Sequence, residues 1–173
     1  MWKSLGDSLI KQSSYPVTSQ PRIADIVDLS VPATDMASAL ERAYLQRFDK
    51  VRAARRAYAA SVHINPARAA SWSDLALTQH QEGVLMNEHP TLHDNKASQQ
   101  CSVLAERVML GALKLAPDVG GLWSALGSIN VGLAKQEYAL RRALQIDSSD
   151  AHTWLKLGRL YHSSGAKDLV KVC

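Results

Sequence analysis

Two stretches of the chain are written almost alike. ALKLAPDVGGLWSALG at 112–127 and ALQIDSSDAHTWLKLG at 143–158 carry Ala, Leu, an apolar residue, Trp, Leu and Gly at matching places, 31 residues apart. This agreement indicates one structural unit that the chain repeats. Such a unit constrains the fold strongly, because repeated units bury their apolar faces on one another.

The four tryptophans of the chain each begin the same short phrase. Leu follows at the third position after Trp, and Gly or Ala follows at the fourth. On a helix, Trp and this Leu share one face, and the small residue lets a neighbouring helix approach closely. The predicted core residues are Trp2, Leu5, Gly6, Tyr58, Trp72, Leu75, Trp123, Leu126, Gly127, Trp154, Leu157 and Gly158.

A second pattern precedes three of the tryptophans in a constant register. Pro66, Pro117 and Ser148 each stand six residues before a Trp. Small, large and small residues stand 12, 8 and 5 positions before both prolines, namely Ala54, Tyr58, Ser61, Ala105, Met109 and Ala112. This spacing predicts a helix that packs against the Trp helix and ends at Pro or Ser.

The phrase W-x2-L-G is typical of the first helix of the tetratricopeptide (TPR) repeat. The chain therefore resembles an all-α TPR helical-hairpin solenoid, irregular, with two loop insertions. We expect a first helix of a partial repeat at 1–12, a Pro- and Ser-rich insertion at 13–35, and TPR repeats over 36–173.

Three details of the helical map follow from local signals. Asp35 is predicted to cap a helix over about 36–49, and a further helix is predicted at 51–65. An inserted loop is expected at about 83–100, because the segment is polar and Gly83 and Pro90 interrupt its helical periodicity. Gln136 stands where a small residue is expected, which predicts a cramped turn or a shortened second helix near 131–138.

Several segments resemble one TPR family more closely. WKSLGDSLI followed by a Pro-rich break, AARRAYAASVHINPARAASWSDLALT and GLWSALGSI are similar to the TPR subunit of the superkiller complex. The resemblance implies a non-catalytic scaffold whose partners are an RNA helicase and a β-propeller subunit. It also implies a role in cytoplasmic, exosome-mediated 3′-to-5′ mRNA decay, with RNA contacted indirectly. Members of that family are much longer, so we expect this chain to be a fragment, the product of a truncated gene model, or one portion of such an array.

The composition of the chain excludes few classes of function, whereas the absence of catalytic motifs argues against an enzyme. The net charge is +4 and the pI is about 9.2, which permits an acidic partner or RNA without requiring either. No phosphate loop, nucleophile elbow or paired-carboxylate phrase is present, so we predict no enzymatic activity and no cofactor. No apolar run approaches the roughly 18 residues of a membrane helix, and two distant cysteines favour a reduced, cytoplasmic compartment.

The histidines raise a metal-site hypothesis that the sequence does not favour. His89 and His93 have a spacing that aligns ligands on a helix, with His80 upstream. Pro90 lies between them and argues for a surface loop. We therefore predict no metal site.

Two groups of cations are candidates for contact with a partner or with RNA. The first lies with Arg42 on the predicted pair of helices at 36–49 and 51–65 and comprises Arg47, Lys50, Arg52, Arg55 and Arg56. Interleaved acids favour a solvated face or an intersubunit contact over direct RNA binding. The second group is Lys156, Arg159 and His162, on the side of a TPR first helix that lines the concave groove.

Two alternatives to a scaffold are weighed against the residues. A free-standing adaptor for acidic peptide tails needs Lys and Asn on successive groove faces, whereas Ser124, Ala125 and Ser128 follow Trp123. A helical-repeat RNA-binding protein needs basic residues continued across repeats, whereas they are confined here to one helix pair and one end.

Overall fold

In the computed structural model, every regular element of the described residues is a helix. The structure describes residues 2–13, 33–88, 94–129 and 132–164. The helices are α1 (Trp2–Ser13), α3 (Ala33–Ile64), α4 (Ala69–Glu88), α5 (Asn95–Leu115), α6 (Gly120–Ile129), α7 (Leu133–Ile146) and α8 (Ala151–Ser163). The all-α prediction is confirmed.

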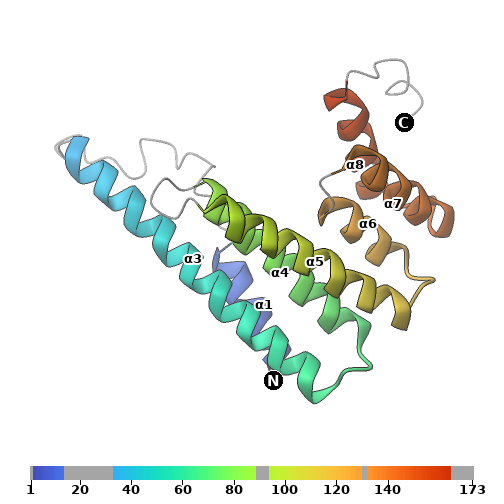
Figure 1. The fold of residues 1–173 in the computed structure, drawn as a ribbon, viewed down its shortest axis with the longest axis horizontal. Helices are drawn as coiled ribbons and strands as arrows, with labels where there is room; N and C mark the ends of the chain where they lie inside the picture. Colours follow the sequence, from blue (N-terminus) through green and yellow to red (C-terminus); the bar gives the residue numbers. More distant parts are fainter. Residues whose placement is uncertain (1, 14–32, 89–93, 130–131, 165–173) are drawn as a thin grey trace.

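Each helix packs against the next one in the chain. The contacts join α1 to α3, then α3 to α4, and continue pair by pair to α8, and α4 also touches α6. Figure 1 shows the result as a row of antiparallel helices, with α1, α3, α4 and α5 at one end and α6, α7 and α8 at the other. Sequence neighbours are therefore also neighbours in space, as expected of stacked hairpins.

One hydrogen bond recurs at every described junction between a hairpin and the next Trp-bearing helix. The indole N–H of Trp72 donates to the carbonyl oxygen of Pro66 at 2.7 Å. Trp123 donates in the same way to Pro117 at 2.8 Å, and Trp154 to Ser148 at 2.8 Å. The indole N–H is a donor only, and the turn that ends the preceding helix supplies its acceptor each time. The bonds place three junctions in one register.

The predicted second-helix pattern lies in the core. Its large residues, Tyr58 and Met109, are buried, and so is Leu140, which takes the equivalent place eight residues before Ser148; the predicted Ser61 is only partly buried. The small residues of the same helices, including Ala54, Ala105, Ala112 and Ala143, are buried as well. The pattern therefore marks the helix face that the Trp-bearing helices cover.

Two glycines of the Trp phrase allow close contact with the large buried residue of the partner helix. A Cβ atom at Gly6 would lie 2.6 Å from the Tyr58 ring, and one at Gly127 would lie 2.8 Å from Leu140 Cγ. Both distances are far below van der Waals contact, so these positions exclude even a methyl group at this helix separation.

The predicted core residues are buried to different degrees. Leu126 and Leu157 are buried with Gly6, Gly127 and Tyr58, while Trp72, Leu75, Trp123, Trp154 and Gly158 are partly buried. The prediction that Leu5 belongs to the core is wrong, because Leu5 is 46% exposed. The described residues place no helix on the α1 face that carries it. The side chain of Trp2 lies outside the described residues.

The two helices expected at 36–49 and 51–65 are one continuous helix. Helix α3 runs from Ala33 to Ile64, so Asp35 lies inside it and is not its N-cap. No Pro or Gly interrupts this stretch, and Phe48 and Val51 at its middle are buried on one face. The burial of that face continues across the expected break and keeps the helix intact.

The loop expected at about 83–100 is much shorter, and the insertion mainly lengthens two helices. Helix α4 continues to Glu88 and α5 begins at Asn95, with 89–93 outside the described residues. Gly83 does not break the helix. It is a contact point, where an added Cβ would lie 2.9 Å from that of Cys101, and its carbonyl accepts a 2.8 Å hydrogen bond from Ser98 Oγ.

The Pro- and Ser-rich insertion expected at 13–35 falls mostly at 14–32, outside the described residues. The shortened second helix near 131–138 is present as α7, which has 14 residues against 21 in α5. It begins at Leu133 after Gly132, whose extended backbone provides no side-chain cap.

The glycine contact yields a test within one helix. Gly127→Ala should lower the free energy of unfolding by about 1–2 kcal/mol, because Leu140 must move to admit the methyl group. Gly121→Ala is the matched control, since nothing lies within 4 Å of its added Cβ and alanine favours the helix. Urea unfolding should show the control unchanged or more stable, and equal stability of the two variants would contradict this packing.

The repeated indole bond yields a second test. Trp72→Phe and Trp123→Phe keep most of the apolar area but leave the carbonyl of Pro66 or Pro117 without its donor. Each should lower the free energy of unfolding by about 0.5–1.5 kcal/mol, measured by denaturant titration. Because the two bonds are equivalent, a large effect at one site and none at the other would contradict a shared junction.

Candidate protein-interaction site

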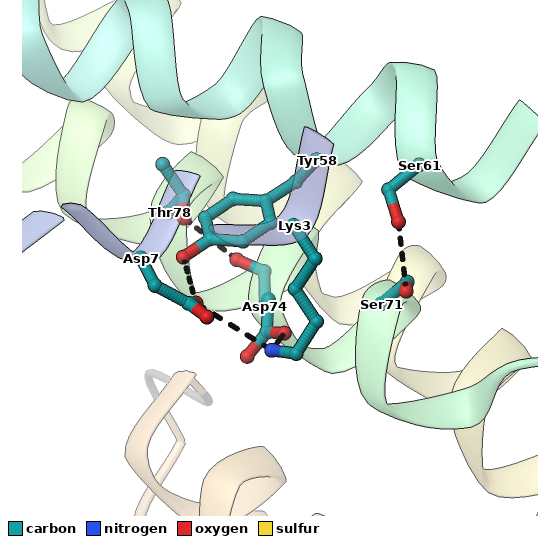
Figure 2. Close-up of polar contacts among 7 residues, drawn as sticks. All are labelled: Lys3, Asp7, Tyr58, Ser61, Ser71, Asp74 and Thr78. Atoms are coloured by element: carbon teal, nitrogen blue, oxygen red, sulfur yellow. Dashed lines mark hydrogen bonds and ion pairs between the residues drawn. The ribbon is translucent and has the colours of Figure 1, made fainter. Parts of the chain in front are cut away.

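A polar network joins α1 to the two helices beside it. The Lys3 ammonium forms ion pairs with Asp74 on α4 and, at 3.5 Å, with Asp7 on its own helix. The Tyr58 hydroxyl on α3 donates to Asp7 at 2.8 Å, and Figure 2 shows the three helices converging on these groups. Burial and the hydrogen bond to Asp7 raise the pKa of Tyr58, so this hydroxyl stays a donor at neutral pH.

The ion pair between Lys3 and Asp74 keeps the lysine charged and lies beside a second polar contact of α3 with α4. Burial alone would lower the pKa of Lys3, but its hydrogen bond to Asp74 and the charges of Asp74 and Asp7 outweigh this and raise it. Next to this pair, Ser61 and Ser71 bring their hydroxyl oxygens to 3.1 Å across the α3–α4 contact (Figure 2). These polar groups satisfy one another, so the network is a structural link between helices.

The arginines of the first candidate group are partly engaged within the chain. Glu82 on α4 is 4% exposed and pairs with Arg55 at 2.6 Å and with Arg52 at 3.4 Å. The Arg52 guanidinium also lies 5.5 Å from the centre of the Phe48 ring. A buried carboxylate requires such cations, so these two arginines serve the α3–α4 interface.

The other members of the first group differ in how far they are exposed to solvent. Arg47 is half-buried, and its Nε atom has no hydrogen-bond partner among the described residues. Lys50 is partly exposed, while Arg56 and Arg42 are exposed. The structure therefore does not bring the whole set together as one free basic patch.

The second candidate group lies on α8 and faces a recess. Lys156 and Arg159 help to line an open pocket of about 370 Å³ between α6, α7 and α8, whereas His162 is exposed elsewhere on the helix. The remaining lining residues are Gly127, Ser128, Gln136, Leu140, Leu160 and Ser163. Two cations thus share one concavity with apolar walls.

Lys156 is held in place by α6. Its ammonium donates to Ser124 Oγ at 3.1 Å, and that oxygen lies 2.7 Å from the Thr153 hydroxyl, which also contacts Asp150. Burial lowers the pKa of Lys156, and the charge of Asp150 opposes this in part. The same carboxylate caps α8 by accepting from the backbone N–H of His152.

Sequence reasoning missed Glu82 and Asp74, and it named Ser124 only as a groove-side residue, although all three hold basic side chains in place. A helical Glu or Asp between polar neighbours reads as solvent-exposed, and only the contact with another helix shows otherwise. A signal for Glu82 is its place four residues after Thr78 and three before Leu85, a spacing that puts the three residues on one face of the helix.

Among the described residues, no three His, Cys, Asp or Glu side chains are grouped so as to hold a metal ion. His89 and His93 lie outside them, and His80 on α4 is partly buried with an Nδ1 atom that has no described partner. Burial lowers the pKa of His80. No helix in the described part of the chain has the length and apolarity to cross a membrane.

Comparison with known proteins finds no match to any family model and no matching curated protein.

The buried carboxylate yields a test of the α3–α4 interface. Glu82→Gln should lower the free energy of unfolding by about 1–2 kcal/mol, because Arg55 and Arg52 then face a neutral amide. The estimate stays below that for a fully buried pair, since both arginines are partly exposed. Glu106→Gln is the control: it breaks the more exposed pair with Lys135 and should cost less than about 0.5 kcal/mol in the same urea titration. Equal losses would assign Glu82 to an ordinary surface pair.

Proposed function

We propose that this chain is a non-catalytic TPR scaffold that binds partner proteins. The observation that carries the proposal is the recurring junction, in which three tryptophans donate to the carbonyl six residues earlier. A row of stacked helical hairpins presents an extended surface, and binding other proteins is the common use of such surfaces.

The partners are proposed from the resemblance in sequence to the superkiller TPR subunit. They are an RNA helicase and a β-propeller subunit, in a cytoplasmic complex that assists exosome-mediated 3′-to-5′ mRNA decay. Indirect RNA contact is supported by the engagement of Arg52 and Arg55 with Glu82, because this carboxylate reduces the net positive charge of the pair.

The adaptor alternative gains one supporting observation from the pocket at α8. Lys156 and Arg159 form a single basic concavity there, although a row of such residues along successive helices is missing from the described residues. An adaptor for peptide segments and a scaffold within a complex would use the same kind of surface. They differ in whether the partner is a short segment or a folded subunit.

Affinity purification with the tagged full chain from cytoplasmic extract tests the proposal. The expected result is retention of a helicase and a β-propeller protein, identified by mass spectrometry, before and after nuclease treatment. As a control, the Gly127→Leu variant disrupts the α6–α7 contact and should lose both proteins. Retention of RNA alone, with binding that weakens steeply as salt is raised, would replace the scaffold by the RNA-binding alternative.

A further inference from the structure

The outer face of α5 carries a row of exposed side chains with a regular spacing. Intervals of four and three residues alternate along this row, whose members are Lys96, Gln100, Val103, Arg107, Leu110 and Lys114. The opposite side of α5, with Ala105 and Met109, is buried in the core together with side chains of α4 and α6. Intervals of three and four keep residues on one side of a helix, and the same spacing forms the seam between paired helices. We call these six residues the α5 stripe.

The middle of the α5 stripe is apolar and open to solvent. Val103 is 49% exposed and Leu110 is 43% exposed, and Leu104 beside them is 44% exposed. An open hollow of about 450 Å³ lies on this face, and its described lining residues are Lys96, Gln99, Gln100, Val103, Leu104 and Arg107. Three large apolar side chains that are close together on one helix face offer an area that the apolar side chains of a partner can cover.

The charges of the α5 stripe are all positive. Its cations are exposed, and none of the described residues forms an ion pair with Lys96, Arg107 or Lys114. The two nearest acids in the sequence are engaged elsewhere. Glu106 pairs with Lys135 on α7 at 3.0 Å, and Asp94 caps α5 by accepting a hydrogen bond from the backbone N–H of Ala97. The stripe therefore presents positive charge that the described part of the chain leaves uncompensated.

Resting on the proposed function as a protein-binding scaffold, we infer that the α5 stripe binds an amphipathic helix of a partner protein, side by side with α5. The partner helix has leucine-like residues at alternating intervals of three and four, with Asp or Glu next to them. Its apolar residues pack on Val103, Leu104 and Leu110, and its carboxylates pair with the cations of the stripe.

The spacing and the charge of the stripe select this occupant. A row with alternating intervals of four and three matches the seam of a second helix better than it matches an extended segment, whose side chains alternate with a period of two. A second copy of this chain is disfavoured, because its own stripe would bring further cations against these cations.

Fluorescence anisotropy with the full chain tests the inference. The probe is a labelled helical peptide with leucine at both seam positions of each heptad and glutamate at the flanking positions, used at a concentration at which it is monomeric. It should bind more tightly than the same residues in an order that breaks the spacing, and high salt should weaken its binding. Val103→Ser combined with Leu110→Ser should weaken binding by about tenfold or more, because apolar contact area is lost. Arg107→Glu should weaken binding by about fivefold and should favour a peptide that carries lysine in place of glutamate.

Two variants on other helices are matched controls. Leu155→Ser removes an apolar side chain of similar exposure, 50%, from α8. Arg142→Glu reverses an exposed charge on α7. Both should leave the affinity for the glutamate peptide unchanged.

Circular dichroism checks that the variants keep the helical content of the unaltered chain. Equal binding of the ordered and reordered peptides, equal losses in the controls, or preference for a labelled oligouridine over the glutamate peptide would each overturn the inference. So would a dimer of the full chain in analytical ultracentrifugation that the Val103 and Leu110 substitutions dissociate, because the stripe would then bind a second copy. The proposed scaffold fails separately, through loss of the helicase and β-propeller proteins in the purification. If those proteins are retained while the glutamate peptide does not bind, the scaffold stands and the inference about the α5 stripe is wrong.

Discussion

The bond from a tryptophan indole to the carbonyl six residues earlier is the constraint from which the arrangement of hairpins follows. It closes the turn between the end of one hairpin and the start of the next Trp-bearing helix, at Pro66, Pro117 and Ser148. With the turn closed, the residue eight positions before it faces the neighbouring helix and is buried in all three cases. The contacts of α3, α5 and α7 with their partners thus share one register, although these helices differ widely in length.

Close approach of backbones is the second requirement. At Gly6 and Gly127 the neighbouring side chain occupies the space of a Cβ atom, and at Gly83 a neighbouring helix does so. These contacts are tighter than ordinary apolar packing, so the helix separation at these points is set by the absence of a methyl group. Glycine, which is often taken as a helix breaker, therefore serves here as a point of close contact between helices.

The sequence predicted the all-α class, the junction register and part of the core, because Trp, Pro and small residues recur at constant spacing. It failed at 83–100 and at the break near residue 50, where turn-forming or charged residues suggested interruption but a buried face kept the helices continuous. It also found the cations of the candidate site, Lys156 and Arg159, and those of α3. It could not separate paired from unpaired ones, because the deciding acid, Glu82, comes from another helix.

The unequal hairpins have a mechanical consequence. Helix α4 has 20 residues and α6 has 10. The indole bonds near their N-terminal ends, from Trp72 and Trp123, are nevertheless almost equal in length, at 2.7 and 2.8 Å. At about 1.5 Å per residue, α4 is some 15 Å longer than its neighbour, and the difference accumulates away from the joint. The geometry of the junction therefore stays the same while the helices that meet there differ in length. The extra turns of α4 extend away from this bond and pack on α3, where Leu85 is buried with Phe48 and Val51.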